Sequence, residues 1–418
     1  MLRDHNPVVI EEFNGLWSRG DIDTVPLDHF SEAVNVQYIE SGFRTRDGIE
    51  PYQTGAAIGN VVRIYNYVLQ TGDTLLILDS NGNIYHAISP TVTYGPILSI
   101  PEMTDFGFVA IAGRAYITPF NSTFNSVGQS QEIGLEDEFV YVYKGDGTAA
   151  RKAAGDPPVD VALVATPGGA GFSDLGFHIF AVVYETDTGY LTALGPLTAA
   201  TNGTPLFGEA TSVSEVLVYD ISDIPVSPDT FVTKRHIVAT KAITGYNGDQ
   251  DGYQFFFVPD GNIDDNTSTT KHVDFYDIDL LEDASHLIDN FNEIPAGVCL
   301  TTYNGRMVLT TECDNISLVR VSAPGEPEAI DQVDGLIIIP LDGTPVTNAQ
   351  EFRDVLYVFK STQTYSCVDN EDEPSSWVPI PIDQGIGAPV HGIGLVLDSG
   401  GVNIEFIIIA DMSGIMLF

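Results

Sequence analysis

Apolar residues along this chain alternate with polar ones over short runs, which is the spacing of β-strands and not that of helices. Three stretches share the same arrangement of an apolar strand, a tight two-residue turn and a second apolar strand: residues 110–118, 302–310 and, more loosely, 351–359. Two-residue turns of this kind join the strands of β-hairpins. The pattern therefore predicts three matching hairpins.

A second repeated pattern lies near the two ends of the chain. Residues 75–82 and 407–414 each contain an apolar run that ends in Asp, with Gly three positions later. Short hairpins that recur with matched turns are typical of radially repeated all-β folds, above all of the β-propeller. We therefore expect an all-β protein with a β-propeller architecture.

The repeated pattern is interrupted in the middle of the chain. Residues 148–158 have the composition of a linker, and the strands predicted after them are longer. Long strands separated by turns favour a β-sandwich of the immunoglobulin or fibronectin type. These strands are expected at residues 177–186, 214–219, 233–240 and 253–258.

The predicted fold is therefore an all-β β-propeller interrupted by an inserted immunoglobulin- or fibronectin-like β-sandwich. An N-terminal extended lead-in, a first set of blades, the inserted sandwich and a second set of blades are expected at residues 1–56, 57–156, 157–290 and 291–418. Within the lead-in, residues 36–39 are predicted as a strand and residues 42–48 as a turn. The chain stops on an apolar run at Phe418, so we expect either a truncated chain or a last strand that closes a blade with N-terminal strands.

The charge balance narrows the choice of partners. The 418 residues include 17 Lys and Arg against 58 Asp and Glu, which gives a formal net charge of −41. Such a surface repels nucleic acids and anionic lipids. Three interpretations remain open: high solubility in a saline habitat, calcium binding by loop carboxylates, or an acidic wall past which DNA slides without adhering.

Cysteine usage and apolar segments indicate where the chain folds. Cys299, Cys313 and Cys367 form no Cys-x-x-Cys motif, so we expect reduced thiols in the core and folding in a cytoplasm. No run reaches the roughly 18 apolar residues of a membrane-spanning helix, and the N-terminus does not read as a secretory signal. We therefore expect no membrane insertion.

No motif for catalysis appears in the sequence. It lacks a Gly-x-Ser-x-Gly elbow, a His-Glu-x-x-His motif and a phosphate-binding loop, and its His residues show no metal spacing, so each is expected to be a hydrogen-bonding residue. The prediction is a protein that is not an enzyme and has no catalytic residue and no cofactor. Paired carboxylates of a propeller glycosidase could be imagined among so many acids, but nothing in the sequence singles out a pair.

Calcium ligands have one weak candidate. Residues 247–252 resemble the start of a calcium loop and contain Asp249 and Asp251. Val258 stands where such a loop needs a bidentate Glu, so a solvated turn is the alternative. The nearby acids Asp264 and Asp265 are open to the same two interpretations.

Three segments together carry a resemblance to a known family. They are residues 13–48 with Gly42-Phe43-Arg44-Thr45-Arg46-Asp47-Gly48, residues 224–277 with Val232-Thr233-Lys234-Arg235-His236, and residues 304–328 with Ser322-Ala323-Pro324-Gly325-Glu326-Pro327-Glu328. Their succession resembles the propeller-containing nozzle or hub proteins at the distal end of short-tailed phage tails. The segments span most of the chain.

The resemblance implies a non-catalytic structural protein of the virion, assembled in the host cytoplasm. It implies a homo-oligomeric ring, a hexamer in that family, around the DNA exit channel, with a tail adaptor and tail fibre or plug proteins as partners. Wall carboxylates within a Debye length of about 8 Å would keep passing DNA centred. Asp249, Asp251, Asp264 and Asp265 are the candidates for this channel wall.

A β-propeller adhesin that binds host-surface glycans is the alternative function. It calls for an exposed aromatic side chain in each repeat, on which sugars stack. The sequence shows no such regular Trp or Tyr, and Trp17 and Trp377 lie in loop-like contexts where packing in a core is the simpler role.

Overall fold

A computed structural model describes residues 36–39, 42–45, 58–69, 72–89, 92–124, 130–159, 163–174, 176–197, 217–243, 253–341, 343–383, 385, 387–388, 393–399, 402–411 and 414–417. The chain divides into two compact units, Met1–Gly55 and Ala56–Phe418. In the first unit, β1 (Val36–Ile39) pairs antiparallel with β2 (Gly42–Thr45). The turn predicted over residues 42–48 is therefore wrong at its start, because Arg44 lies opposite Gln37 in a strand.

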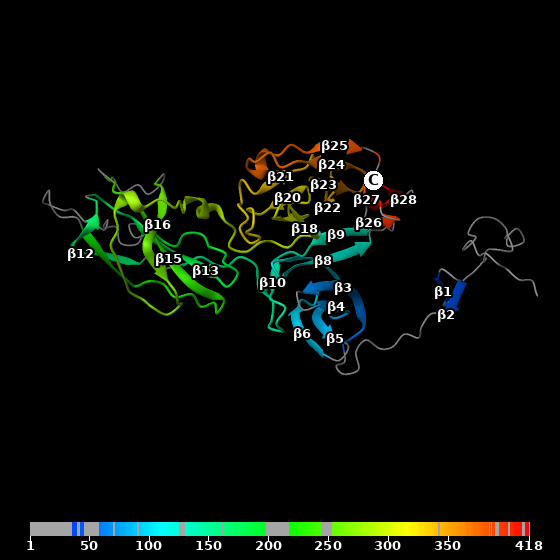
Figure 1. The fold of residues 1–418 in the computed structure, drawn as a ribbon, viewed down its shortest axis with the longest axis horizontal. Coiled ribbons are helices and arrows are strands. Elements are labelled where there is room, and N and C mark those ends of the chain that lie inside the picture. The colour runs from blue at the N-terminus through cyan, green and yellow to red at the C-terminus, as the bar shows by residue number, and fades with distance from the viewer. Residues whose placement is uncertain are drawn as a thin grey trace, which may run out of the picture. The chain divides into compact units, whose positions relative to one another are not determined.

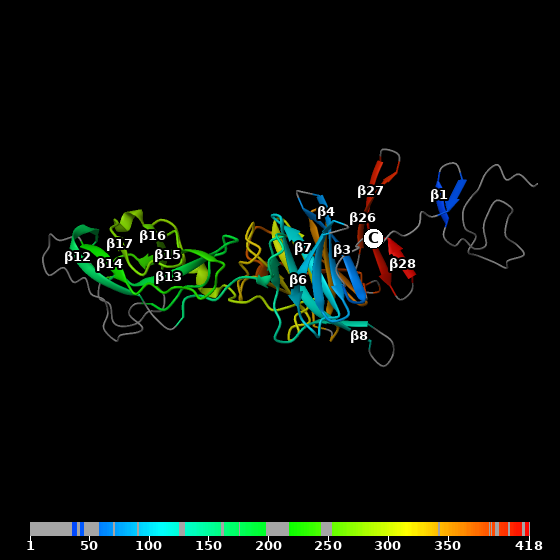
Figure 2. The same cartoon turned by 90° about the horizontal axis from the view of Figure 1, so that it is seen from below.

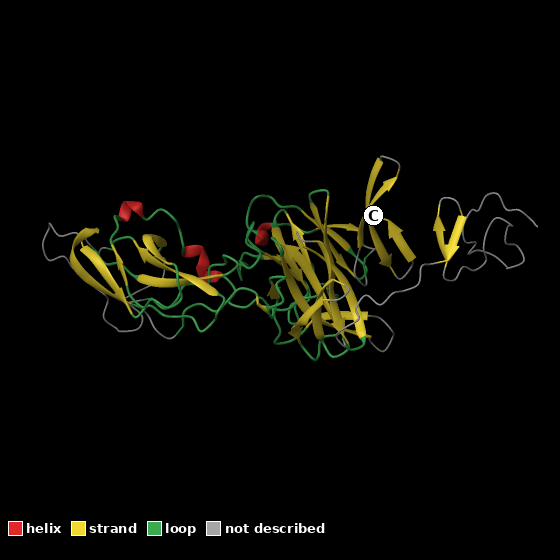
Figure 3. Ribbon diagram, turned by 60° about the horizontal axis from the view of Figure 1, so that its bottom comes forward, coloured by secondary structure: helices red, strands yellow, loops and turns green. Residues whose placement is uncertain are grey.

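The second unit confirms the all-β prediction, and strands dominate it in Figure 3. Five sheets are antiparallel meanders in which the strands of the main path are paired in the order of the sequence (Figure 1). The first two are β3–β6 (Val61–Leu69, Gly72–Asp79, Asn83–Ser89, Val92–Ser99) and β7-β8-β10-β11 (Asp105–Ile111, Arg114–Phe124, Tyr141–Tyr143, Arg151–Lys152), where β9 (Ser130–Gly134) also pairs with β8.

The other meander sheets follow later in the chain. They are β18–β21 (Cys299–Tyr303, Arg306–Thr310, Leu318–Val321, Leu336–Ile338), β22–β25 (Val346–Phe352, Val355–Lys360, Thr364–Cys367, Ile380–Asp383) and the three-stranded β26–β28 (Ile393–Ser399, Val402–Asp411, Gly414–Leu417). We call these five sheets the repeated sheets.

All three predicted hairpins are confirmed, and they share one turn geometry. Each joins the first and second strand of a repeated sheet: β7 to β8, β18 to β19 and β22 to β23. Both turn residues have positive φ in every case: Ala112 and Gly113, Asn304 and Gly305, Arg353 and Asp354. Two successive residues with positive φ form the type I′ turn, whose twist matches that of paired strands.

The Asp-to-Gly pattern near the chain ends also marks equivalent turns, those that join the second and third strands of a sheet. In the first copy, the Asp79 carboxylate accepts hydrogen bonds from the backbone N–H groups of Asn81 and Asn83, both at 2.9 Å. Gly82 has a φ of 76° and its Cβ position lies only 1.9 Å from the Ile100 carbonyl oxygen. A larger residue than Gly therefore does not fit this turn.

Four of the repeated sheets pack through their first strands. Strand β7 contacts β3, and both strands are labelled in Figure 2. Strand β7 also contacts β18, and β18 contacts β22. Apolar clusters fill the space between successive sheets, for example Tyr67 with Phe106 and Val308 with Val346. At Gly107 a Cβ atom would lie 2.5 Å from the Val298 carbonyl oxygen, so only Gly allows these two backbones to approach.

A middle segment, residues 157–290, contains the two remaining sheets of this unit. They are β12-β14-β17 (Val164–Ser173, Leu217–Ser222, Lys271–Val273) and β13-β15-β16 (Phe180–Thr186, Val232–Thr240, Phe255–Ile263). Both sheets contribute to one buried cluster that includes Phe180, Tyr219 and Ile237. The four strands predicted here are confirmed as β13 to β16, whereas β12 and β17 were missed. The 3-10 helices η2 (Asp277–Asp279) and η3 (Ser285–Asp289) follow β17, and η4 (Pro374–Ser376) lies between β24 and β25.

The middle segment leaves and rejoins the repeated sheets at neighbouring points. Ala154 forms an isolated β-bridge with Glu293, and Phe139 forms one with Pro295. The Lys152 ammonium also pairs with the Glu293 carboxylate at 2.5 Å. The two ends of the excursion are thus joined by backbone and side-chain contacts.

The predicted thiols and Trp377 can be placed in the fold. All three cysteines are free; Cys367 is buried, while Cys299 and Cys313 are partly exposed. Trp377 is buried and packs edge-on against Tyr303, so its predicted core role is confirmed. Among the described residues, no helix has the length and apolar character needed to cross a membrane.

Candidate functional site

The structure describes two of the four predicted wall residues. Asp264 and Asp265 lie in the loop between β16 and β17, and the Asp264 side chain is exposed. Asp249 and Asp251 fall outside the described residues, so their roles at a channel wall or a calcium site stay predictions. Among the residues that the structure does describe, no group of three or more His, Cys, Asp or Glu side chains is placed to hold a metal ion.

The Asp265 carboxylate shapes its own loop. It accepts hydrogen bonds from the Ser268 hydroxyl at 2.7 Å and from the backbone N–H groups of Ser268 and Thr267 at 2.6 Å. These bonds lower the pKa of Asp265 well below its usual range. Asp265 is therefore charged, but its oxygens are already occupied, whereas Asp264 next to it faces solvent.

A single buried cation holds this loop to the rest of the middle segment. Arg235 is 0% exposed and donates to the carbonyl oxygens of Asp265, Pro225 and Ser268 at 3.0, 2.9 and 2.6 Å. It also pairs with the Asp265 carboxylate at 3.3 Å. No local pattern predicts this contact, because Arg235 and Asp265 lie 30 positions apart.

The basic side chains that the structure describes are engaged in contacts within the molecule. Every Lys and Arg whose side chain the structure describes contacts a carboxylate, a carbonyl oxygen or an aromatic ring. The carboxylate pairs are Arg63–Asp105, Lys144–Asp187, Arg151–Asp187, Arg151–Glu328, Lys152–Glu293, Lys234–Glu185, Arg235–Asp265, Arg306–Asp369 and Arg320–Glu312. The other contacts are Arg114 to the Asp187 carbonyl, Lys271 to the Asn262 carbonyl, Lys360 to the Pro340 carbonyl, Lys241 over the Phe256 ring and Arg353 over the Phe352 ring.

Because the described basic side chains are paired, the net charge of the chain appears at its surface mainly as unpaired carboxylates. With 58 acids against 17 bases, most carboxylates have no basic partner. Since the described cations are already engaged, they offer few free donors to a phosphate backbone. The charge that the described surface presents to a polyanion is therefore mainly repulsive.

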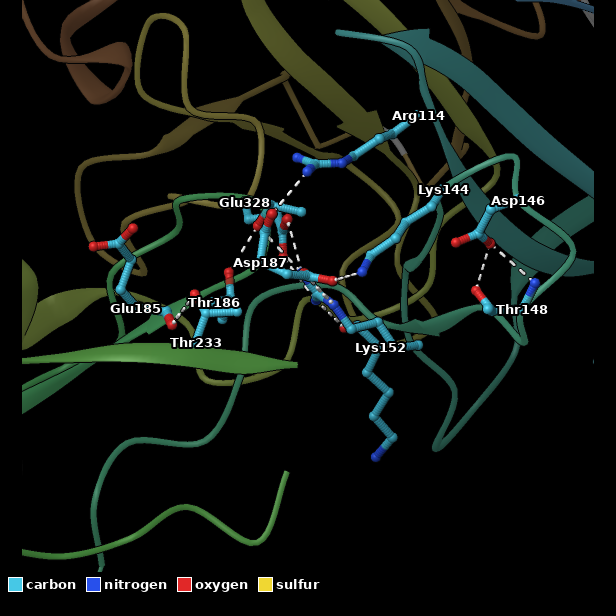
Figure 4. A network of polar contacts seen from close by, with 12 residues as sticks. Arg114, Lys144, Asp146, Thr148, Lys152, Glu185, Thr186, Asp187, Thr233 and Glu328 are labelled. Atoms are coloured by element: carbon cyan, nitrogen blue, oxygen red, sulfur yellow. Dashed lines mark hydrogen bonds and ion pairs between the residues drawn. The ribbon is translucent and has the colours of Figure 1, made fainter. Parts of the chain in front are cut away.

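One polar network joins the middle segment to two of the repeated sheets (Figure 4). Arg151 of β11 lies between the Asp187 carboxylate, which follows β13, and the Glu328 carboxylate from the connection between β20 and β21, at 2.9 and 3.0 Å. Glu328 is 1% exposed and also accepts from the Ala154 N–H at 2.6 Å. Lys144 pairs with Asp187 as well.

The network keeps Asp187 ionised. Burial alone would raise the pKa of Asp187, but hydrogen bonds from Lys144 and Arg151 outweigh burial and lower it. Arg114 donates to the backbone carbonyl of Asp187 at 2.7 Å. The turn after β13 is thus fixed to the second repeated sheet by both side-chain and backbone contacts.

Two buried histidines are hydrogen-bonding residues, as predicted. His86 lies between the Tyr143 and Thr74 hydroxyls at 2.7 and 2.9 Å, and burial lowers its pKa. His178 contacts the Asp277 carboxylate at 3.0 Å and the Tyr219 hydroxyl at 2.9 Å. Both imidazoles are almost fully buried, so neither can reach a substrate from solvent.

A cavity of about 250 Å³ lies where the first strands of four repeated sheets meet. Its walls come from β3, β7, β18 and β22 and include Tyr65, Phe108, Leu300 and Ala349. The lining contains no carboxylate, so this cavity lacks the paired acids on which glycosidases depend. The Cys299 thiol donates to the Asn348 side-chain oxygen at its edge.

Comparisons with known proteins define no family for the chain. No protein-family model and no curated protein matches it. Solved structures with similarity include the BBS1 N-terminal region in complex with ARL6 (10% identity, 88% of this chain and 93% of that chain, TM-score 0.22). They also include the β-xylosidase/α-arabinofuranosidase CoXyl43 from a compost metagenome (9%, 80% and 93%, TM-score 0.17) and the AfRom2 CNH domain (11%, 87% and 96%, TM-score 0.18). Similarities at these TM-scores define neither fold nor function.

Proposed function

We propose that this protein is a non-catalytic structural component of a phage tail, of the nozzle or hub type. Several copies would form a ring, a hexamer by the resemblance noted above, around the channel through which the genome leaves. The protein would assemble in the host cytoplasm and act in the virion. A tail adaptor and tail fibre or plug proteins would be its neighbours.

The proposal includes a finer description of the fold. The repeated sheets would be the blades of one β-propeller, and residues 157–290 would be an immunoglobulin- or fibronectin-like sandwich inserted between the second and third blades. The meander order and the contacts between first strands support the propeller. The core shared by two three-stranded sheets supports the sandwich.

The observation that carries the function is the engagement of the basic side chains. A conduit for DNA must contact a polyanion without binding it, and free Lys and Arg side chains are what bind phosphates. In this chain the described cations are held by internal acids, carbonyls and rings, while a large excess of carboxylates remains. A ring of copies would repeat this negative charge around one axis.

The wall of the channel would come from loops of the middle segment. Asp264 is the described candidate, because its side chain is exposed; Asp249 and Asp251 remain candidates beside it. Asp265 contributes charge near the same place, but its principal role is to shape the loop around Arg235.

Electron microscopy tests the proposal directly. Images of the purified protein and of its parent particle should show rings with an axial hole, and a reconstruction should place Asp264 on the lumen. Rings whose lumen is neutral or basic would contradict the acidic conduit. Particles that stay monomeric at high concentration and are absent from phage tails would contradict the structural role.

One observation favours the adhesin as second candidate. Phe172 and Tyr276 in the middle segment stack at 4.7 Å between ring centroids, and both are about half exposed. Exposed aromatic rings are common platforms for sugars. Binding of the wild-type protein to a glycan array, lost in a Tyr276→Ala variant, would support the adhesin and displace the conduit.

A further inference from the structure

An acidic hollow of about 470 Å³ lies outside the features used so far. Its walls come from η3, from the connection between β20 and β21, and from the residues before η4. Carboxylates line all three walls: Asp289, Glu326, Asp331, Asp334 and residues 371–373. The hollow falls within the size range of sites that hold side chains or small ligands.

Most of these carboxylates have no partner in the described part of the chain. Asp331 accepts from the backbone N–H groups of Val333 and Asp334, and Asp334 accepts from the Ser375 hydroxyl. The side-chain oxygens of Asp289, Glu326 and residues 371–373 make no hydrogen bond or ion pair with any described residue. The hollow is therefore open to a cationic group from elsewhere.

The one guanidinium in the wall does not neutralise the hollow. Arg306 lies 3.6 Å from the Asp369 carboxylate and donates to the Ser322 carbonyl at 3.0 Å. It also lies beside the Trp377 ring, 5.6 Å from its centroid. Arg306 is therefore engaged by Asp369, Ser322 and Trp377, and the carboxylates that line the hollow outnumber its basic groups.

Asn290 gives an independent indication of a ligand. It lines the hollow, is 6% exposed, and its side-chain amide makes no hydrogen bond with the described residues. An amide that lines the hollow and has no partner among the described residues is free to bond with a group that enters the hollow. The amide oxygen is an acceptor suited to an N–H donor.

We propose that the acidic hollow binds a segment of a partner protein that carries Lys or Arg side chains. The ammonium or guanidinium group is held by the free carboxylates of residues 371–373 and Asp289, and the Asn290 amide accepts one of its N–H groups. Charge-assisted hydrogen bonds of this kind are about twice as strong as neutral ones. The inference holds whether or not the protein belongs to a phage tail, since it depends only on this hollow.

The chemistry of the hollow favours a basic segment over a bare metal ion. No group of three or more His, Cys, Asp or Glu among the described residues converges as metal ligands do. The volume is also many times the roughly 30 Å³ share of one water molecule in the liquid, which leaves room for a whole side chain.

Peptide binding to the full chain tests the proposal against general attraction by an acidic protein. The probe is a fluorescein-labelled hexa-arginine peptide, followed by fluorescence anisotropy at physiological salt. The variant Glu371→Gln/Asp372→Asn/Glu373→Gln should lose at least tenfold in affinity. The matched control Asp264→Asn/Asp279→Asn/Glu282→Gln removes three exposed acids elsewhere and should change affinity less than twofold.

A second variant separates geometry from charge. Asn290→Ala leaves the net charge unchanged and should weaken peptide binding about threefold while the circular dichroism spectrum stays that of the wild type. Equal losses in the two triple variants, or no effect of Asn290→Ala, would overturn the proposal. So would calcium binding by the wild type that the first triple variant abolishes, or self-association that depends on the same acids.

Discussion

The repeated sheets and the middle segment bury small antiparallel sheets in different ways. The repeated sheets use apolar clusters between successive sheets, as between Val308 and Val346, and three of them join their first two strands by the same type of turn. The middle segment has one core between two sheets and relies in addition on buried polar groups, above all Arg235. Its loops are therefore fixed by long-range polar contacts rather than by local turn chemistry.

The largest loss of stability is expected on removal of Arg235, the buried polar group on which the middle segment relies most. Arg235→Met removes the donor to three carbonyl oxygens and should lower the free energy of unfolding by about 4 kcal/mol. Hydrogen exchange should show lost protection in β15 to β17, while β18 to β25 keep theirs. Equal loss in both regions would mean that they do not differ in the way described.

The counterpart in the repeated sheets is an apolar truncation. Leu309→Ala at a fully buried position of β19 should cost about 3 kcal/mol, because it leaves a cavity in the cluster that Leu309 shares with Tyr116. Protection should fall in β7 to β11 and β18 to β21, and stay unchanged in β13 to β16. Loss of protection at β13 to β16 would show that the apolar clusters also stabilise the middle segment.

The joint between the two regions is the next target. Glu328→Gln removes one of the two carboxylates around Arg151 and should destabilise the protein by about 2 kcal/mol. A double-mutant cycle with Asp187→Asn should give a coupling energy of about 1 kcal/mol. Strictly additive effects would mean that the two acids act independently and that the network does not couple the regions.

Mild acid should affect the repeated sheets first. The pKa of His86 is lowered in the folded state, so its contribution to stability is present above the unfolded pKa of about 6.5 and is lost as the pH falls through the lowered value. Urea unfolding should therefore give a lower free energy of unfolding at pH 5 than at pH 7. His86→Gln should remove this slope whatever its own stability, and a slope that persists would assign the effect to other groups.

The smallest effect is expected at the third hairpin. Arg353 and Asp354 both have positive φ, where Asn and Gly are favoured, so Arg353→Asn/Asp354→Gly should stabilise the protein by about 0.5 kcal/mol. As a control, Gly305→Ala meets no atom within 4 Å, so any cost, about 1 kcal/mol, comes from the backbone alone. Thermal unfolding measures both, and a destabilised double variant would show that the side chains outweigh the turn geometry.

The difference between the repeated sheets and the middle segment also explains which elements the sequence could predict. The hairpins around residues 112–113 and 304–305 were predictable because a type I′ turn is specified by two adjacent residues. Strand β12 was missed because it contains Pro167-Gly168-Gly169, and its pairing with β14 passes through register shifts that depend on tertiary contacts. Local chemistry suffices for the hairpins of the repeats and for β13 to β16, but it fails for β12.

The candidate site shows the same limit. Residue counts predicted an acidic protein, and Asp264 is exposed as a wall residue must be. Counts could not reveal that the described cations are engaged, because partners such as Arg151 and Glu328 lie 177 positions apart. The acidic hollow was also invisible, since three separate segments form its walls.

The bridge between Ala154 and Glu293 has a consequence for how such a chain can change over time. An excursion that starts and ends at one place can be lengthened, shortened or exchanged at little entropic cost, because closing a longer loop adds only about 0.6 kcal/mol per doubling of its length. The sheets on either side keep their own turns and cores. The middle segment can therefore acquire new surface residues during evolution while the repeated sheets keep their structure.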